Sequence, residues 1–119
     1  MNESREVAAR ALLDQAMQLH QQGKLEQAAN FYAEHLKQAP NDAQSLRLYG
    51  ILARDSGDEQ LSLSLLIRLA KLQPENAAAF DEIALTYMAA GLLDDAAEAL
   101  QHSLQLKPDN LRALTNQGA

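Results

Sequence analysis

Several residue types are absent from this chain or scarce in it. The 119 residues include no cysteine and no tryptophan, which excludes a disulfide framework, a thiolate nucleophile and a cysteine-based zinc site. There are only one valine, three isoleucines and two threonines. Because strands depend on β-branched and aromatic residues, this composition excludes a β-sheet core. Leucine and alanine instead supply 22 residues each, and both favour helices.

Positive charge is scarce as well. Ten Lys and Arg against sixteen Asp and Glu give a net charge of -6 and a pI of about 4.9. Proteins that bind nucleic acid or anionic lipid present basic surfaces, so the composition argues against both partners. No apolar run approaches the ~18 residues of a membrane helix, and the first residues lack the pattern of a signal peptide. We therefore expect a cytoplasmic protein that binds neither nucleic acid nor a membrane.

Every proline and every glycine follows a register of 34 residues. The prolines are Pro40, Pro74 and Pro108, three glycines are Gly23, Gly57 and Gly91, and the other two, Gly50 and Gly118, lie twice that spacing apart. Glycine accommodates the left-handed conformation that ends many helices, and proline cannot continue a helix interior. These breakers therefore divide the chain into pairs of helices.

Residues between the breakers keep the same register. Asp42, Asn76 and Asn110 each lie two residues after a proline, where a short polar side chain can cap the next helix. Apolar residues from Leu25 to Leu36 and from Leu93 to Leu104 have the i, i+3, i+4, i+7, i+11 spacing of an amphipathic helix. Two columns hold only small residues, Ala16/Gly50/Ala84 and Ala28/Ser62/Ala96. Small columns predict a close approach of facing helices.

Together these features resemble the tetratricopeptide repeat (TPR) family, whose unit is a 34-residue helix–turn–helix. The matching residues are Leu12, Ala16, Gly23, Ala28, Tyr32 and Pro40 in repeat 9–42; Leu46, Tyr49, Gly50, Gly57, Ser62, Leu66 and Pro74 in repeat 43–76; and Phe80, Ile83, Ala84, Tyr87, Gly91, Ala96, Leu100 and Pro108 in repeat 77–110. The resemblance implies one all-α domain over residues 1–119, an α-solenoid of three repeats wound into a right-handed superhelix. Gln15, His35, Leu69 and Ser103 depart from the family pattern, and we expect looser packing around them.

Both ends extend the repeats. The first helix is expected to run from about Ser4 to Gln22. Residues 110–119 begin a fourth cycle, which is either a short C-terminal capping helix with Leu111 and Leu114 packed inward or the start of further repeats in a longer protein. An uncovered face at Leu104, Leu111 and Leu114 would also permit a homodimer about a two-fold axis.

We find no catalytic, cofactor or metal site in the sequence. His20, His35 and His102 never have the i, i+4 spacing that brings two imidazoles to one metal. Adjacent carboxylates such as Asp94 and Asp95 diverge by about 100° around a helix, and their place in a first turn is explained by the helix dipole. Phosphate-binding glycine loops and Ser–His–Asp sets are also absent. We therefore expect no enzyme activity, metal or cofactor.

A binding groove is the better prospect. By resemblance to the family, the first helix of each repeat lines a concave surface, and the groove-facing columns are Leu13/Arg47/Asp81, Met17/Ile51/Leu85 and His20/Arg54/Met88. The middle column is apolar throughout, with Arg10, Arg47 and Arg54 expected at one end and Asp81 and Glu82 at the other. Such a strip suits an apolar or amphipathic peptide. Alternatively, Met17, Ile51 and Leu85 only pack between neighbouring helices or under the C-terminal helix.

One specialisation of the family is not matched. TPR domains that hold the acidic C-terminal tails of heat-shock chaperones use a clamp of Lys, Asn, Asn, Lys and Arg. The matching positions here are Leu13, Met17, Leu48, Ala78 and Glu82. Glu82 has the wrong charge for a carboxylate ligand, so we do not expect that class of partner.

The leading hypothesis is a protein–protein interaction module, a scaffold or adaptor that binds a peptide or partner protein in the concave groove without catalysis. Two alternatives remain open. One is the N-terminal recruitment domain of a larger enzyme, for example a transferase, that continues past residue 119. The other is a small chaperone for an apolar client.

Overall fold

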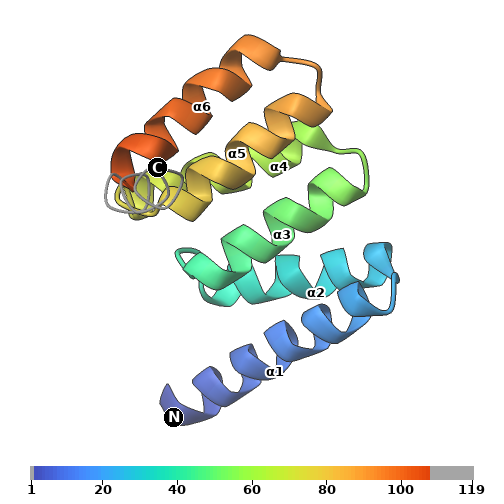
Figure 1. Ribbon diagram of the computed structural model, residues 1–119. Helices are drawn as coiled ribbons and strands as arrows, with labels where there is room; N and C mark the ends of the chain where they lie inside the picture. Colours follow the sequence, from blue (N-terminus) through green and yellow to red (C-terminus); the bar gives the residue numbers. More distant parts are fainter. Residues whose placement is uncertain (1, 108–119) are drawn as a thin grey trace, which may run out of the picture.

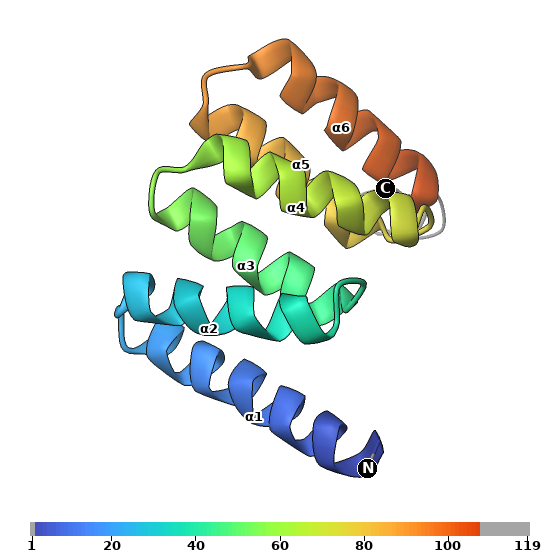
Figure 2. The same ribbon diagram turned by 180° about the vertical axis from the view of Figure 1, so that it is seen from behind.

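The computed structural model describes residues 2–107, which form six α-helices and no strand. The helices are α1 (Asn2–Gln21), α2 (Leu25–Gln38), α3 (Ala43–Asp55), α4 (Glu59–Leu72), α5 (Ala77–Ala89) and α6 (Leu93–Leu106). They pair into three antiparallel hairpins, α1–α2, α3–α4 and α5–α6, which stack in chain order (Figures 1 and 2). The predicted all-α architecture of helix–turn–helix repeats is confirmed.

The turn inside each hairpin depends on a glycine. Gly23, Gly57 and Gly91 have φ angles of 78°, 84° and 79°, in the left-handed region that other residues adopt only with strain. In the second hairpin, Asp58 follows the glycine and accepts a hydrogen bond from Leu61 N at 3.1 Å, a cap that the sequence analysis did not predict. The glycine register therefore fixes where each hairpin reverses direction.

The turns between hairpins end in the predicted caps. Asp42 Oδ2 accepts a hydrogen bond from Ser45 N at 2.8 Å, and Asn76 Oδ1 accepts one from Ala79 N at 3.3 Å. The third predicted cap, Asn110, lies outside the described residues. So do Pro108 and the capping helix or partial fourth repeat expected over 110–119, with Leu111 and Leu114.

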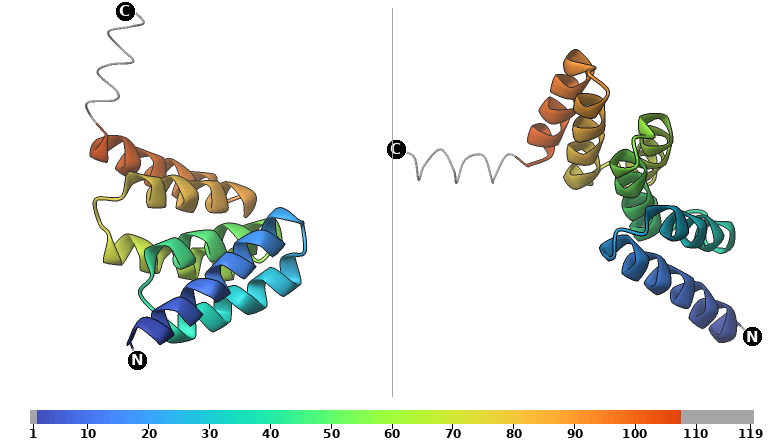
Figure 3. Two further views of the ribbon diagram at one scale, coloured as in Figure 1. Left: turned by 90° about the horizontal axis from the view of Figure 1, so that it is seen from below. Right: turned by 90° about the vertical axis from the view of Figure 1, so that its right-hand side faces the viewer.

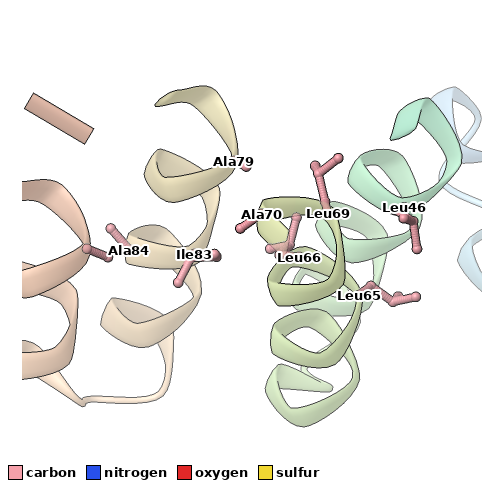
Figure 4. Close-up of a cluster of buried hydrophobic side chains, with 9 residues drawn as sticks. Leu46, Leu65, Leu66, Leu69, Ala70, Ala79, Ile83 and Ala84 are labelled. Carbon is pink, nitrogen blue, oxygen red and sulfur yellow. The ribbon is translucent and has the colours of Figure 1, made fainter. Parts of the chain in front are cut away.

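Small buried residues let the two helices of a hairpin approach closely. The two predicted small columns are buried throughout, at Ala16, Gly50, Ala84, Ala28, Ser62 and Ala96. A Cβ atom on Gly50 would lie only 2.7 Å from Leu66 Cγ, so a larger residue would displace its neighbour. Figure 4 shows the core between the second and third hairpins, where Leu66, Leu69 and Ala70 of α4 belong to one buried cluster with residues of α5.

Three residues that were expected to loosen the packing are instead buried. His35, Leu69 and Ser103 are 4%, 0% and 1% exposed, so the prediction was wrong at these positions. Hydrogen bonds satisfy the two polar side chains, because His35 Nδ1 pairs with Ser45 Oγ and Ser103 Oγ donates to a carboxylate of α5. Gln15 is exposed, because no hairpin precedes α1 among the described residues.

The stack is curved, with the odd-numbered helices on the inside. α1 contacts α3 and α3 contacts α5, whereas no even-numbered helix in residues 2–107 contacts another even-numbered one. We call the side formed by α1, α3 and α5 the inner wall, and the side formed by α2, α4 and α6 the outer side. Figure 3 shows the stack of hairpins in two further views. The radius of gyration is 16.1 Å, above the ~13 Å of a compact domain of about 100 residues, as expected for a superhelix.

The last described helix has an uncovered apolar face. Tyr32 of α2 and Leu66 of α4 are both 0% exposed. Leu100 occupies the equivalent position on α6 and is 41% exposed, and Leu93 and Leu104 on the same helix are 66% and 49% exposed. In residues 2–107, α6 therefore exposes a leucine at the position where α2 and α4 bury Tyr32 and Leu66.

Candidate functional site

The inner wall carries an apolar column whose exposure increases along the stack. Met17 on α1, Ile51 on α3 and Leu85 on α5 occupy equivalent positions in the register. Met17 and Ile51 are half-buried, whereas Leu85 is 47% exposed. Met88, one turn further along α5, is 48% exposed. The apolar surface of the inner wall is therefore most accessible on α5.

One predicted groove residue does not reach this surface. Leu13 is 2% exposed and belongs to the core cluster around Ala16, Leu19 and Tyr32. It is therefore a core residue and not a surface that a ligand could contact. The remaining predicted groove residues are polar and half-buried: His20, Arg47, Arg54 and Asp81.

Ion pairs on the inner wall join residues that we had expected at opposite ends. Arg54 Nη2 on α3 lies 2.9 Å from Glu82 Oε1 on α5, and the side chains are 16% and 21% exposed. Arg54 Nη1 also donates to the Glu82 carbonyl oxygen at 3.1 Å and to Thr86 Oγ1 at 3.3 Å. Arg10 pairs with Asp14 at 3.3 Å. The expected separation of a basic end from an acidic end was therefore wrong for Arg54, because Glu82 of the next repeat neutralises it.

His20 connects the first two hairpins at the end of α1. Its Nδ1 lies 3.2 Å from the Tyr32 hydroxyl, and its Nε2 lies 3.5 Å from Asp55 Oδ2. Burial raises the pKa of Tyr32 to about 12, although the positive charge of Arg47 opposes the rise. Arg47 itself forms no ion pair within residues 2–107. His20 therefore has a structural role here, while the charge of Arg47 remains available.

Asp81 is engaged with the end of α6. Lys107 Nζ lies 2.8 Å from Asp81 Oδ2, and Ser103 Oγ donates to Oδ1 of the same carboxylate. Partial burial works to raise the pKa of Asp81, but these two hydrogen bonds and the charge of Lys107 outweigh it and lower the pKa. The carboxylate therefore stays ionised and fastens α6 to α5.

The positions of the chaperone-tail clamp offer no carboxylate site. Leu13 is buried, Met17 and Leu48 are half-buried, and Ala78 is exposed. Glu82 is a carboxylate paired with an arginine of α3. None of the five side chains supplies a cation or an amide at those positions.

A cavity on the outer side was not predicted from the sequence. It has a volume of about 550 Å³ and lies between α4 and α6, against α5. The sequence signals for it were Ala99 and His102, which stand one register after the longer Leu65 and Arg68.

Residues 2–107 contain neither a candidate metal site nor a helix suited to a membrane. No group of three or more His, Asp or Glu side chains is placed to hold a metal ion there. None of the six helices is both long and apolar enough to cross a bilayer.

Comparison with known proteins gives distant relatives by sequence. No family model matches the chain. The PEX5-related protein of Homo sapiens is 30% identical over 87 residues, which are 73% of this chain and 14% of that protein. The PEX5-related protein of Mus musculus has the same identity over the same length, and the match covers 15% of it. The chain thus spans about one seventh of the length of the curated relatives it matches.

Solved structures are similar over most of the chain. MamA has a TM-score of 0.80 at 15% identity, covering 87% of this chain and 61% of MamA. The O-GlcNAc transferase of Thermobaculum terrenum has a TM-score of 0.77 at 27% identity, covering 88% of this chain and 20% of the enzyme. The second TPR of Spaghetti (RPAP3), bound to the HSP90 peptide SRMEEVD, has a TM-score of 0.77 at 16% identity. The match covers 87% of this chain and 98% of that TPR chain. Taken with the three stacked hairpins and their 34-residue register, these likenesses show that the chain has the tetratricopeptide-repeat fold.

Proposed function

We propose that this chain is a protein-interaction module, without catalysis of its own, that holds an apolar or amphipathic peptide segment of a partner protein against the inner wall. The apolar contacts would come from Met17, Ile51, Leu85 and Met88. Arg47, which forms no ion pair within residues 2–107, would pair with an acidic group on the peptide. This partner differs from the acidic tails of heat-shock chaperones, because the five clamp positions carry other residues.

The observation that carries the proposal is the exposure of large apolar side chains on the concave side. Leu85 and Met88 leave nearly half of their surface in water, next to the half-buried Ile51 of the preceding repeat. Contiguous exposed apolar surface on a protein is often an interaction site. The peptide-bound TPR of RPAP3 supports the general class of partner, since it shares this fold.

Peptide selection tests the proposal directly. A random peptide library displayed on phage would be selected on the immobilised chain, and the affinity of the selected peptides would be measured by calorimetry. Replacing Ile51 and Leu85 together with Asp should weaken binding by about 30-fold or more, because loss of a central apolar contact typically costs about 2 kcal/mol or more. Leu85→Asp alone, at the more exposed position, should give a smaller loss in the same direction.

The matched control is Leu72→Asp. Leu72 is 43% exposed at the end of α4 and does not belong to the inner-wall column, so this variant should bind like the wild type. Circular dichroism and thermal unfolding establish that all variants remain folded. Unchanged affinity in the Ile51→Asp, Leu85→Asp double variant would place the peptide elsewhere.

A second candidate function is self-association through α6. The observation that favours it is the exposed face at Leu93, Leu100 and Leu104, since Tyr32 and Leu66, the equivalents of Leu100 on α2 and α4, are buried. Sedimentation velocity over a range of concentrations should then show a dimer that Leu100→Lys with Leu104→Lys converts to a monomer. Val7→Lys on α1, where the valine is 69% exposed, is the control. A monomer at all concentrations would exclude this candidate.

A further inference from the structure

The outer side of the stack contains a cavity that the proposed function does not use. It has a volume of about 550 Å³, within the ~300–1,000 Å³ range of ligand sites. Its apolar lining comes from α4, α5 and α6, chiefly Ile67, Ala70, Phe80, Ile83, Tyr87 and Ala99. None of the residues that line it belongs to the columns of the inner wall, so the two surfaces can be tested separately.

Two lining residues of α6 are shorter than their counterparts on α4 in the preceding repeat. Ala99 of α6 stands where α4 has Leu65, which is 5% exposed and packed in the core. His102 stands where α4 has Arg68, whose guanidinium reaches back and donates to the carbonyl oxygen of Pro40. His102 instead stacks on the ring of Phe80, with ring centroids 4.1 Å apart. The shorter pair leaves open the volume that Leu65 and Arg68 occupy one repeat earlier.

The groove between the first two hairpins gives an internal check. It has its own cavity of about 460 Å³, around Ala53. The two cavities share three register positions, those of Ile83, Tyr87 and Asp95. Leu65 and Arg68 do not line the smaller cavity, whereas their counterparts Ala99 and His102 line the larger one.

Charge around the larger cavity is unevenly placed. Asp95 and Glu98 lie one turn apart on α6, both exposed, and neither forms an ion pair within residues 2–107. Residues at i and i+3 share a helix face, so the two carboxylates act on the same place. Asp95 is in the first turn of α6, at the end of the cavity near Tyr87, whereas Lys71 and His102 lie toward Phe80, about 10 Å away along α5 at 1.5 Å per residue.

We propose that this cavity receives one bulky apolar side chain of a partner protein, with a basic residue beside it that pairs with Asp95 and Glu98. The apolar lining suits a bulky apolar side chain of the partner. The two carboxylates, which form no ion pair within residues 2–107, suit a basic residue beside that side chain. The site is independent of the peptide site proposed for the inner wall. It lies on the outer side, so a module with both surfaces can hold two partners at once.

The three isoleucines of the chain provide the reporters for a test. Ile67 and Ile83 line the outer cavity, and Ile51 lies on the inner wall. Methyl NMR of an isoleucine-labelled chain would be recorded during titration with two blocked dipeptides, acetyl-Trp-Lys-amide and acetyl-Trp-Glu-amide. We expect the lysine dipeptide to shift the Ile67 and Ile83 methyls and not that of Ile51, and to bind about threefold or more tighter than the glutamate dipeptide, as exposed ion pairs allow.

Two variants separate cavity filling from charge. Ala99→Leu restores the residue of the preceding repeat, so it should fill the cavity and weaken binding of the lysine dipeptide by about tenfold. Asp95→Asn with Glu98→Gln leaves the cavity open and should abolish the preference for lysine. The proposal is overturned if the Ile67 and Ile83 methyls do not move, if Ala99→Leu binds like the wild type, or if the glutamate dipeptide shifts these two methyls with equal affinity. Since the charge variant changes only exposed residues, it keeps the test valid even if Ala99→Leu unfolds.

Discussion

Arg54 of α3 and Glu82 of α5 join the second hairpin to the third across the inner wall. Their charged atoms are 2.9 Å apart, and the arginine also donates to the backbone of Glu82 and to Thr86. The glutamate oxygen Oε1 accepts no well-aligned hydrogen bond, although it is shielded from water. The pair therefore holds the two hairpins together mainly through charge, in a place where solvent screens it only in part.

Removing the glutamate charge should destabilise the chain. Glu82→Gln leaves a mostly buried guanidinium without its counter-charge, which we expect to cost about 1–3 kcal/mol in the free energy of unfolding. Urea denaturation followed by circular dichroism measures the loss. The control is Glu34→Gln, which breaks the exposed Lys37–Glu34 pair and should cost less than about 0.5 kcal/mol. Equal effects of the two substitutions would show that the inner pair is no stronger than a surface one.

Gly50→Ala should destabilise the second hairpin despite the better helix propensity of alanine. The propensity gain is about 1 kcal/mol, but the added Cβ would lie 2.7 Å from Leu66 Cγ in a buried contact. Overpacking of this kind typically costs about 1–3 kcal/mol, so the net change should be a lower melting temperature. Combining it with Leu66→Ala should cost less than the sum of the two single substitutions. A more stable Gly50→Ala variant would contradict the close approach.

Stability should fall at alkaline pH because of Tyr32. Its phenol ionises near pH 10 in the unfolded chain, whereas burial raises its pKa to about 12 in the folded chain. The unfolded state therefore loses the proton first. The contribution of Tyr32 to the free energy of unfolding is intact below pH 10 and declines between pH 10 and 12, by up to about 1.4 kcal/mol per pH unit. Tyr32→Phe lacks this titration. The difference between the two proteins in urea unfolding should shrink as the pH rises through that window, and a constant difference would contradict the pKa shift.

Leu65→Ala should open, in the first groove, a counterpart of the outer cavity. Leu65 is 5% exposed and belongs to the core cluster of the second and third hairpins, so its truncation should cost about 2–5 kcal/mol. If the side chain at this register position controls the cavity, the variant should bind acetyl-Trp-amide in the first groove as well as in the outer cavity. The wild type should bind it in the outer cavity and not in the first groove, and methyl NMR distinguishes the two places. If Leu65→Ala loses stability but binds no acetyl-Trp-amide in the first groove, then Leu65 only packs the core and does not control the cavity.

Most of the fold could be predicted from the 34-residue periodicity of the sequence. The glycines that take left-handed conformations, the caps at Asp42 and Asn76 and the two small columns all follow from the 34-residue register, because each depends on a local requirement that one residue type meets best. The first helix, expected from about Ser4 to Gln22, runs from Asn2 to Gln21. Helix ends that depend on such local chemistry can be predicted from a single sequence.

Side-chain partners across repeats could not be predicted in the same way. Arg54 was assigned to a basic end of the groove, but the superhelix brings it against Glu82 of the next repeat. His35 and Ser103 were expected to loosen the core, yet each finds a hydrogen-bond partner on a helix that the spacing alone does not identify. These contacts depend on the angle between successive hairpins, which the register does not encode.

The uncovered leucines of α6 make the described part of the chain open-ended at that side. A copy of residues 40–73 joined after Lys107 keeps the register and would place a new first helix against Leu100 and Leu104, in the manner that α3 covers Tyr32. Each added unit would lengthen the concave surface by one repeat without altering the units before it. The chain is thus a starting point for engineered scaffolds of graded length, in which the number of binding positions is chosen by duplication.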